Sequence, residues 1–259
     1  MKFSCIPLNF GRELARDKTM TYEDWIDMAV DFGLDGTEIY ENFVTDRDES
    51  GMAKLADYVH EKGLEASMFT AEPHLCNPAD REVGVARIKK AVDGALIFGT
   101  DIVRVVSGHG SKDLELDVVL QSIADGISAC LDYAEEKGVR LAFEDHWGIG
   151  TNVPDFMKIL ELVGDDRLKV NLDTANVGSE NIVELTELVK DRVVHTHCSE
   201  LLNNRHGIVI GKGDVDFKSV LGILKNNDYD GWVSLEPLAG GRDDLEFSVN
   251  HIRDTWNSL

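Results

Sequence analysis

Eight short apolar runs recur along the chain at intervals of roughly 25–40 residues, the spacing of repeated strand and helix units. They are rich in Val, Ile, Leu and Phe, and they cover Phe3–Ile6, Leu34–Ile39, Leu64–Phe69, Ile102–Val106, Val139–Phe143, Leu168–Leu172, Val193–Thr196 and Trp232–Leu235. Dividing 259 residues by eight gives about 32, enough for one strand, one helix and two connections. Continuous apolar runs are typical of parallel strands that are buried on both faces.

Amphipathic segments separate these runs, with apolar residues returning every three or four positions. Examples are Tyr22–Phe32, Met52–Lys62, Val83–Phe98, Val118–Lys137 and Phe217–Asn226. A glycine often precedes the next run, where it can supply the left-handed conformation that ends a helix: Gly33, Gly63, Gly99, Gly138 and Gly231. The pattern predicts one α/β domain over residues 1–259, folded as a (β/α)8 TIM barrel.

An open doubly wound sheet is the alternative fold. Its usual nucleotide-binding fingerprint is GxGxxG after the first strand. This chain has only Asn9-Phe10-Gly11 there, and Gly108-His109-Gly110 does not continue as that fingerprint. The closed barrel is therefore favoured.

Composition limits the partners that we expect. The chain carries 26 basic and 48 acidic residues, a net charge of −22, without the clustered Lys and Arg that nucleic acid or anionic membrane binding needs. The four cysteines, Cys5, Cys76, Cys130 and Cys198, show no CxxC spacing, and residues 1–10 lack the apolar core of a signal peptide. We expect a cytoplasmic protein with no nucleic-acid or membrane partner, and leave a homodimer or homotetramer open.

Carboxylates and imidazoles follow nearly every apolar run, and in a barrel these positions share one mouth. The sharpest subset is Glu144, Asp173, His197 and Glu236. Three carboxylates in an apolar mouth would cost several kcal/mol unless a cation joined them. We therefore predict one divalent metal ion, with Mn²⁺ the first expectation and Mg²⁺, Co²⁺ or Zn²⁺ also suited to these ligands.

Other side chains in the same mouth are candidates for contact with a small polar, carbohydrate-like substrate. They are Glu38, His74, His109, His146, Trp147, Arg205 and Lys212. Glu38 could instead support a metal ligand or form a structural ion pair. His195 shares a strand face with His197 but lies one layer deeper, which favours a buried supporting role.

Several motifs resemble those of the xylose isomerase-like TIM barrels, a family of sugar phosphate isomerases and epimerases related to D-tagatose 3-epimerase, hydroxypyruvate isomerase, inosose-processing enzymes and, more distantly, endonuclease IV. They are Gly36–Glu38, Leu141–His146, Asn171–Asn176, His195–Glu200, Gly211–Phe217 and Tyr229–Glu236. The resemblance implies that Glu144, Asp173, His197 and Glu236 bind one divalent metal. Ketose 3-epimerases, however, usually carry His and Glu where this chain has Asn176 and Gly150, and Arg where it has Asn203, two positions before Arg205.

The resulting hypothesis is a metal-dependent sugar, sugar phosphate or cyclitol isomerase or epimerase acting through an enediolate. Glu144 and Glu236 would exchange the proton while the metal stabilises negative charge. The main alternative is a metal-dependent dehydratase of a keto-cyclitol or dehydroshikimate-like substrate. A non-catalytic sugar-binding barrel and an endonuclease IV-like phosphodiesterase remain further alternatives, the latter disfavoured by the negative charge.

Overall fold

The computed structural model describes residues 1–70, 72–108, 110, 113–146 and 148–259. Its strands are β1 (Lys2–Cys5), β2 (Gly36–Tyr40), β3 (Glu65–Thr70), β4 (Ile102–Val105), β5 (Arg140–Glu144), β6 (Lys169–Asp173), β7 (Val193–Cys198) and β8 (Trp232–Leu235). The α-helices are α1 (Tyr22–Asp31), α2 (Glu49–Glu61), α3 (Arg81–Phe98), α4 (Leu116–Glu136), α5 (Val153–Val163), α6 (Ile182–Val189), α7 (Phe217–Asn226) and α8 (Arg242–Ser258). Each of the eight predicted runs thus overlaps one strand: Trp232–Leu235 matches β8 at both ends, and the ends of the others differ by at most two residues.

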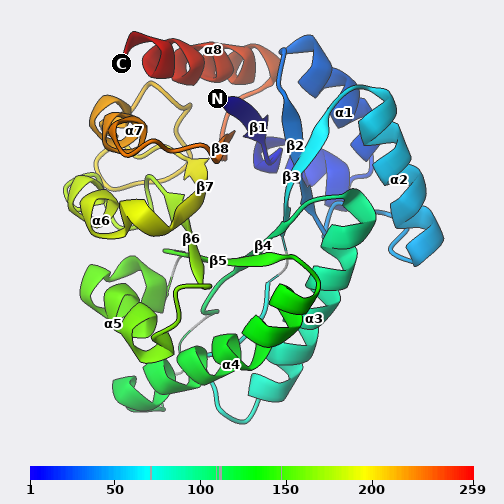
Figure 1. Cartoon of the computed structure of the whole chain (residues 1–259). Helices are drawn as coiled ribbons and strands as arrows, with labels where there is room; N and C mark the ends of the chain where they lie inside the picture. The colour runs from blue at the N-terminus through cyan, green and yellow to red at the C-terminus, as the bar shows by residue number, and fades with distance from the viewer. Residues whose placement is uncertain (71, 109, 111–112, 147) are drawn as a thin grey trace.

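The strands form a single parallel sheet in the order β1-β8-β7-β6-β5-β4-β3-β2. The two ends of this order are joined just before β2, where Asp35 N donates to Phe3 O at 2.9 Å and Phe3 N donates to Asp35 Oδ2 at 2.8 Å. Helices surround the strands (Figure 1). The predicted (β/α)8 barrel is confirmed.

The parallel register sets the level of the polar residues at the barrel mouth. Glu144 pairs with Asn171, Asp173 with His197, and His197 with Ser234 across neighbouring strands. Two residues below Glu144 on the same strand, Ala142 packs with Met68 and Ile102 in a small buried cluster. This apolar layer lies beneath the polar mouth.

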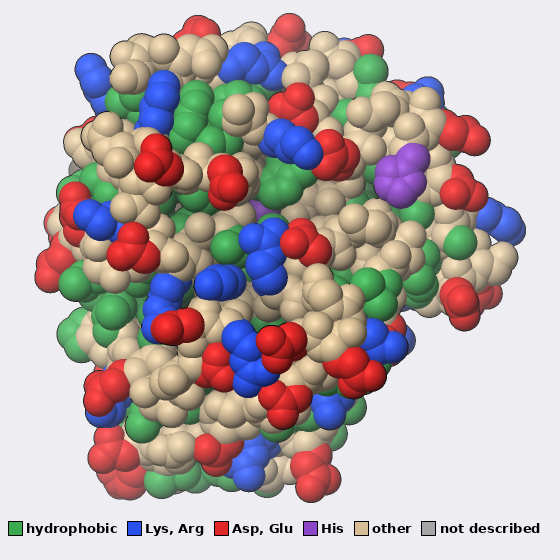
Figure 2. Space-filling model, viewed as in Figure 1, with side chains coloured by type: hydrophobic (Ala, Val, Ile, Leu, Met, Phe, Trp, Pro, Cys, Tyr) green, Lys and Arg blue, Asp and Glu red, His purple; other side chains and the backbone are tan. Residues whose placement is uncertain are grey.

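The outer surface is charged, and acidic and basic side chains are interspersed on the face that Figure 2 presents. Within the described residues, no helix has the combination of length and hydropathy needed to cross a bilayer.

Four of the five predicted helix-ending glycines have left-handed backbone. The φ angles of Gly33, Gly63, Gly99 and Gly138 are 64°, 80°, 71° and 70°. The prediction for Gly231 was wrong, because the left-handed residue after α7 is Asp228, with φ of 53°. Gly231 is required for space instead: a Cβ there would lie 2.3 Å from Val194 O and 2.5 Å from the Tyr229 hydroxyl oxygen.

We predict that Gly231→Ala lowers the free energy of unfolding by about 1–3 kcal/mol, because the backbone oxygen of Val194 must move to admit the methyl group. Gly222→Ala in α7 is the control, since its Cβ would meet only Leu259 Cδ2, at an ordinary 3.5 Å. That substitution should be neutral or stabilising by about 0.5–1 kcal/mol. Urea unfolding of both variants tests this, and equal losses of stability would contradict the steric argument.

Candidate metal centre and adjoining cavity

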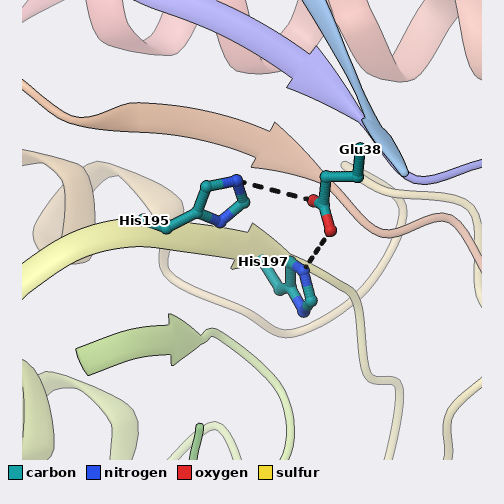
Figure 3. Close-up of side chains that lie close together, drawn as sticks. All are labelled: Glu38, His195 and His197. Atoms are coloured by element: carbon teal, nitrogen blue, oxygen red, sulfur yellow. Dashed lines mark hydrogen bonds and ion pairs between the residues drawn. The ribbon is translucent and has the colours of Figure 1, made fainter. Parts of the chain in front are cut away.

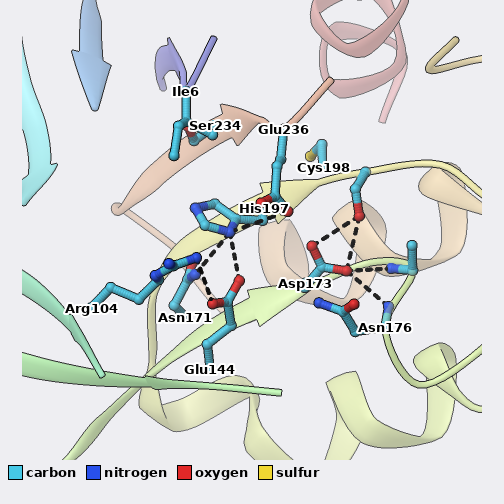
Figure 4. A network of polar contacts seen from close by, with 12 residues as sticks. Ile6, Arg104, Glu144, Asn171, Asp173, Asn176, His197, Cys198, Ser234 and Glu236 are labelled. Atoms are coloured by element: carbon cyan, nitrogen blue, oxygen red, sulfur yellow. Dashed lines mark hydrogen bonds and ion pairs between the residues drawn. The ribbon is translucent and has the colours of Figure 1, made fainter. Parts of the chain in front are cut away.

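Four side chains from successive strand ends converge at the barrel mouth (Figure 4). Glu144 ends β5, Asp173 ends β6, His197 lies in β7, and Glu236 follows β8. Each offers a ligand atom, and these atoms all lie within 4.8 Å of one another. All four residues are buried. The structure therefore brings together the quartet that the sequence predicted as metal ligands.

The imidazole of His197 connects the quartet to a carboxylate deeper in the barrel. Its Nδ1 lies 2.6 Å from Glu144 Oε1 and 3.5 Å from Glu236 Oε2, while its Nε2 lies 3.0 Å from Glu38 Oε2 (Figure 3). Burial acts to lower the pKa of His197, but Glu38, Glu236 and Glu144 outweigh it and raise that pKa well above its ordinary value. Nδ1 thus faces the other candidate ligands, and Glu38 fixes the ring from behind, as carboxylates do for metal-bound histidines.

Asp173 is held by the turn that follows it. Its Oδ1 accepts hydrogen bonds from Ala175 N at 2.7 Å and Asn176 N at 2.8 Å, and the Ser199 hydroxyl lies within 2.9 Å of both carboxylate oxygens. Its own backbone N donates to Asp145 Oδ1 at 2.7 Å. These contacts keep the carboxylate in one orientation.

The carboxylates fit a divalent cation. Burial raises the pKa of Glu236 well above its ordinary value; His197 opposes this shift, whereas Asp173 and Glu144 add to it. Burial and the nearby Asp173 likewise raise the pKa of Asp145, whose buried Oδ2 has no hydrogen-bond partner within the described residues. So many buried carboxylates can stay together only if protons or a cation balance them. Oxygen donors with one imidazole nitrogen suit Mn²⁺, Mg²⁺, Co²⁺ or Zn²⁺.

Arg104, on β4, is a site residue that the sequence analysis missed. Its Nη1 donates to Glu144 Oε2 at 3.0 Å, and its Nη2 lies 3.8 Å from Glu72 Oε1. Burial acts to lower the pKa of Arg104, but Glu144, Glu236, Glu38 and Glu72 together raise it, so the guanidinium stays charged. Although burial acts to raise the pKa of Glu144, Arg104 and His197 lower it. A lone arginine inside the apolar run Ile102–Val106 was the available signal.

A cavity of about 470 Å³ adjoins the quartet. Its wall combines polar and apolar side chains: Ile6, Leu8, Tyr40, Glu72, Arg104, His146, Asn176, Ser199, His206, Glu236 and Leu238. Glu236 is the quartet member that lines it, whereas Glu144 is fully buried behind Arg104. The volume is that of a small-molecule site.

The other predicted contact residues divide between the cavity and its surroundings. His146 lines the cavity, but His74 is exposed outside its lining. Glu38 lies beneath His197, where it also accepts from the Ser234 hydroxyl, so its position favours orienting the imidazole over touching substrate. His195 lies beside it, and burial lowers the pKa of His195 to about 4. His109 and Trp147 lie outside the described residues.

The loop after β7 brings His206, rather than the predicted Arg205 or Lys212, to the cavity. Arg205 is exposed, and Lys212 pairs with Asp244 at 3.0 Å on the outer surface. Buried Glu200 anchors this loop by accepting from the backbone N atoms of Leu201, Gly211 and Val215 at 2.9–3.0 Å. No spacing in the sequence distinguishes this carboxylate from an exposed one.

Comparison with known proteins identifies the family. The family model described as xylose isomerase-like TIM barrel matches residues 26–255. The chain belongs to this family. This confirms the resemblance carried by the strand-end motifs.

Curated relatives include inosose dehydratases. The one from Clostridium beijerinckii is 25% identical over 135 residues, covering 44% of this chain and 45% of that protein. The one from Lacticaseibacillus casei is 22% identical over 252 residues, covering 85% and 83%. The match to the Clostridium beijerinckii protein thus covers about half of that protein's length.

Solved structures share the fold over nearly the whole chain. A probable 3-DHS dehydratase involved in petrobactin synthesis from Bacillus anthracis has a TM-score of 0.80 and 19% identity, covering 98% of this chain and 99% of that one. A D-psicose 3-epimerase from Clostridium cellulolyticum H10 has a TM-score of 0.83 and 17% identity, covering 99% of both. The IOLI protein with a bound zinc atom has a TM-score of 0.77 and 17% identity, covering 98% and 96%.

We predict that Asp173→Asn abolishes binding of one divalent ion per chain, measured by calorimetric titration with Mn²⁺ and with Zn²⁺. The amide keeps an oxygen for the backbone donors of the turn, so the barrel should remain folded by circular dichroism. Asp101→Asn is the control, because Asp101 precedes β4 at the other end of the barrel and pairs with Arg140. Unchanged binding by Asp173→Asn would rule out this residue as a ligand.

We also predict that Glu38→Gln weakens metal affinity by about 10–100-fold, the usual loss when a carboxylate behind a metal-bound histidine is removed. The reason is that the carboxylate holds His197 Nε2 at 3.0 Å and thereby directs Nδ1 toward the quartet. Glu65→Gln is the matched control, since Glu65 begins β3 and pairs with Lys2 on the surface. Calorimetric titration with Mn²⁺ and with Zn²⁺ measures the affinities. Equal metal affinities of the Glu38→Gln and Glu65→Gln variants would contradict the role of Glu38 in orienting His197.

Proposed function

We propose that this chain is a metal-dependent carbohydrate-modifying enzyme that removes water from a keto-cyclitol or dehydroshikimate-like substrate. Support comes from the buried quartet beside a cavity of small-molecule size, and from relatives named inosose dehydratase. A solved structure of the same fold is titled a probable 3-DHS dehydratase. When bound, a divalent ion would polarise the substrate carbonyl and stabilise the negative charge that develops on its oxygen.

One observation favours dehydration over two-base epimerisation: the two glutamates of the quartet have unequal access to the cavity. Glu236 lines it, whereas Glu144 is fully buried and engaged by Arg104 and His197. An epimerase of the two-base type needs a free base on each face of the reacting carbon, whereas both carboxylate oxygens of Glu144 are already paired, one with Arg104 and one with His197. A single facing carboxylate suffices to remove the proton next to a carbonyl.

The elimination can be assigned to groups at the cavity wall. Glu236 accepts the proton from the carbon next to the carbonyl, and the electron pair of that C–H bond forms a C=C bond as the C–O bond to the β-hydroxyl breaks. His146, which also lines the cavity, donates a proton to the departing hydroxyl, which leaves as water. Atoms and charge balance without a redox partner.

Single-base sugar isomerisation is the second candidate. It needs one base, and Glu236, which lines the cavity, could move a proton between adjacent carbons. Both reactions begin with the same proton removal. They differ in the next step: dehydration expels the β-hydroxyl as water, whereas isomerisation returns the proton to the neighbouring carbon and keeps that hydroxyl.

The reaction class can be tested with metal-loaded protein in heavy water, using 2-keto-myo-inositol, 3-dehydroshikimate and D-fructose as substrates. We expect a product lighter by one water from a cyclic ketone, detected by mass spectrometry and NMR. Deuterium incorporation into an isomer without water loss would favour the isomerase. Conversion of none of the three would contradict the proposed function.

We predict that Glu236→Gln lowers kcat by about 10²–10⁴-fold, the usual contribution of a positioned acid or base. Metal content must be measured in parallel, because Glu236 is also a candidate ligand. Glu246→Gln, an exposed change on α8, provides the control. Full activity of a metal-loaded Glu236→Gln enzyme would exclude this glutamate as the base.

A further inference from the structure

Arg104 carries the positive charge in the cavity wall, and carboxylates already pair with it. Arg104 is the one described lining residue with a fixed positive charge, its side chain is 3% exposed, and it pairs with Glu144 at 3.0 Å. Glu72 and Glu236 add carboxylates to the same wall. A divalent ion and Arg104 would together carry three positive charges. Four carboxylates face them, those of Glu72, Glu144, Asp173 and Glu236, so one formal negative charge remains, since 3 − 4 = −1. An anionic group entering the cavity therefore meets no unpaired Lys or Arg side chain among the described lining residues.

Glu72 is held in the cavity wall through one of its two carboxylate oxygens. Its Oε1 accepts from the Tyr40 hydroxyl at 2.7 Å and lies 3.8 Å from Arg104 Nη2. Tyr40 in turn accepts from Asn42 Nδ2 at 2.7 Å, and burial together with Glu72 raises the pKa of Tyr40 to about 12, so it remains a donor. Within the described residues, no group is bonded to Glu72 Oε2, and the side chain is 32% exposed. This carboxylate can accept a hydrogen bond from a ligand.

We infer that the cavity takes an uncharged polyhydroxy ketone and that Glu72 determines this specificity, by accepting a hydrogen bond from a substrate hydroxyl and repelling carboxylated or phosphorylated analogues. The inference rests on the proposed function and narrows it to the keto-cyclitol class. A carboxylate accepts a charge-assisted hydrogen bond from a hydroxyl, whereas it offers a deprotonated acid only repulsion. The net charge of −22 also disfavours approach of anions to the chain.

Binding to the metal-loaded full chain tests this independently of turnover. The probes are 2-keto-myo-inositol, which is neutral, 3-dehydroshikimate, which carries a carboxylate, and D-fructose 6-phosphate. Dissociation constants are read from tryptophan fluorescence immediately after mixing. We expect the neutral ketone to bind at least about tenfold more tightly than either anion.

Variants then assign the preference to Glu72. Glu72→Gln should weaken binding of the neutral ketone, strengthen binding of the anions, and reduce the ratio between them by about tenfold. The matched control is Glu41→Gln, since Glu41 pairs with Arg87 outside the cavity lining and should leave the ratio unchanged. Tyr40→Phe, which removes the donor that fixes Glu72, should reduce the ratio by a smaller factor.

Three outcomes would overturn the inference: wild-type chain binding an anion as tightly as the neutral ketone, a Glu72→Gln ratio equal to that of wild type, or binding of none of the probes. The wild-type comparison holds even if a variant fails to fold. The expected preference without conversion of the ketone would leave the inference standing and defeat the proposed reaction instead.

Discussion

The site depends on the imidazole of His197 being held between carboxylates on two sides. Glu38 fixes Nε2 from within the barrel, so Nδ1 meets Glu144 and Glu236 at the mouth. Because charged groups at this depth are costly, each must find a partner. Arg104 forms an ion pair with Glu144. The hydroxyls of Ser199 and Ser234 donate hydrogen bonds to Asp173 and Glu38, respectively. The remaining negative charge is what makes a divalent cation the natural complement of the site.

The same electrostatics shape the chemistry. The guanidinium that would otherwise attract an anion is committed to Glu144, and Glu72 adds a second carboxylate beside it. Of the two glutamates in the quartet, one is locked by its partners and the other faces the cavity. This asymmetry between the two glutamates is the reason for proposing a reaction with one base, a dehydration, instead of a two-base epimerisation.

Much of the site was predictable because strand ends in a parallel barrel have only one place to meet. Four residues directly follow apolar runs, namely Glu144, Asp173, His197 and Glu236, so the sequence predicts that they lie together, and the structure places their ligand atoms within 4.8 Å of one another. Lys212 and Arg205 lie in a long loop whose path is set by Glu200, and sequence spacing could not say that the loop would present His206 instead. The place of Glu72 in the cavity wall could not be predicted from the sequence either, because it depends on contacts with Tyr40 and Arg104, which lie on other strands.

The sequence by itself determined the alternation of eight strands with amphipathic helices, the barrel and the identity of the quartet, because period and strand-end position are local properties of the chain. Only the tertiary structure decided which charged side chains are paired with one another and which side chains face the cavity. That Arg104 neutralises Glu144, that Glu38 lies behind His197, and that Glu236 alone of the quartet faces the cavity all follow from distances between strands. Pairing energies fall steeply with such distances, and the linear order of residues does not contain them.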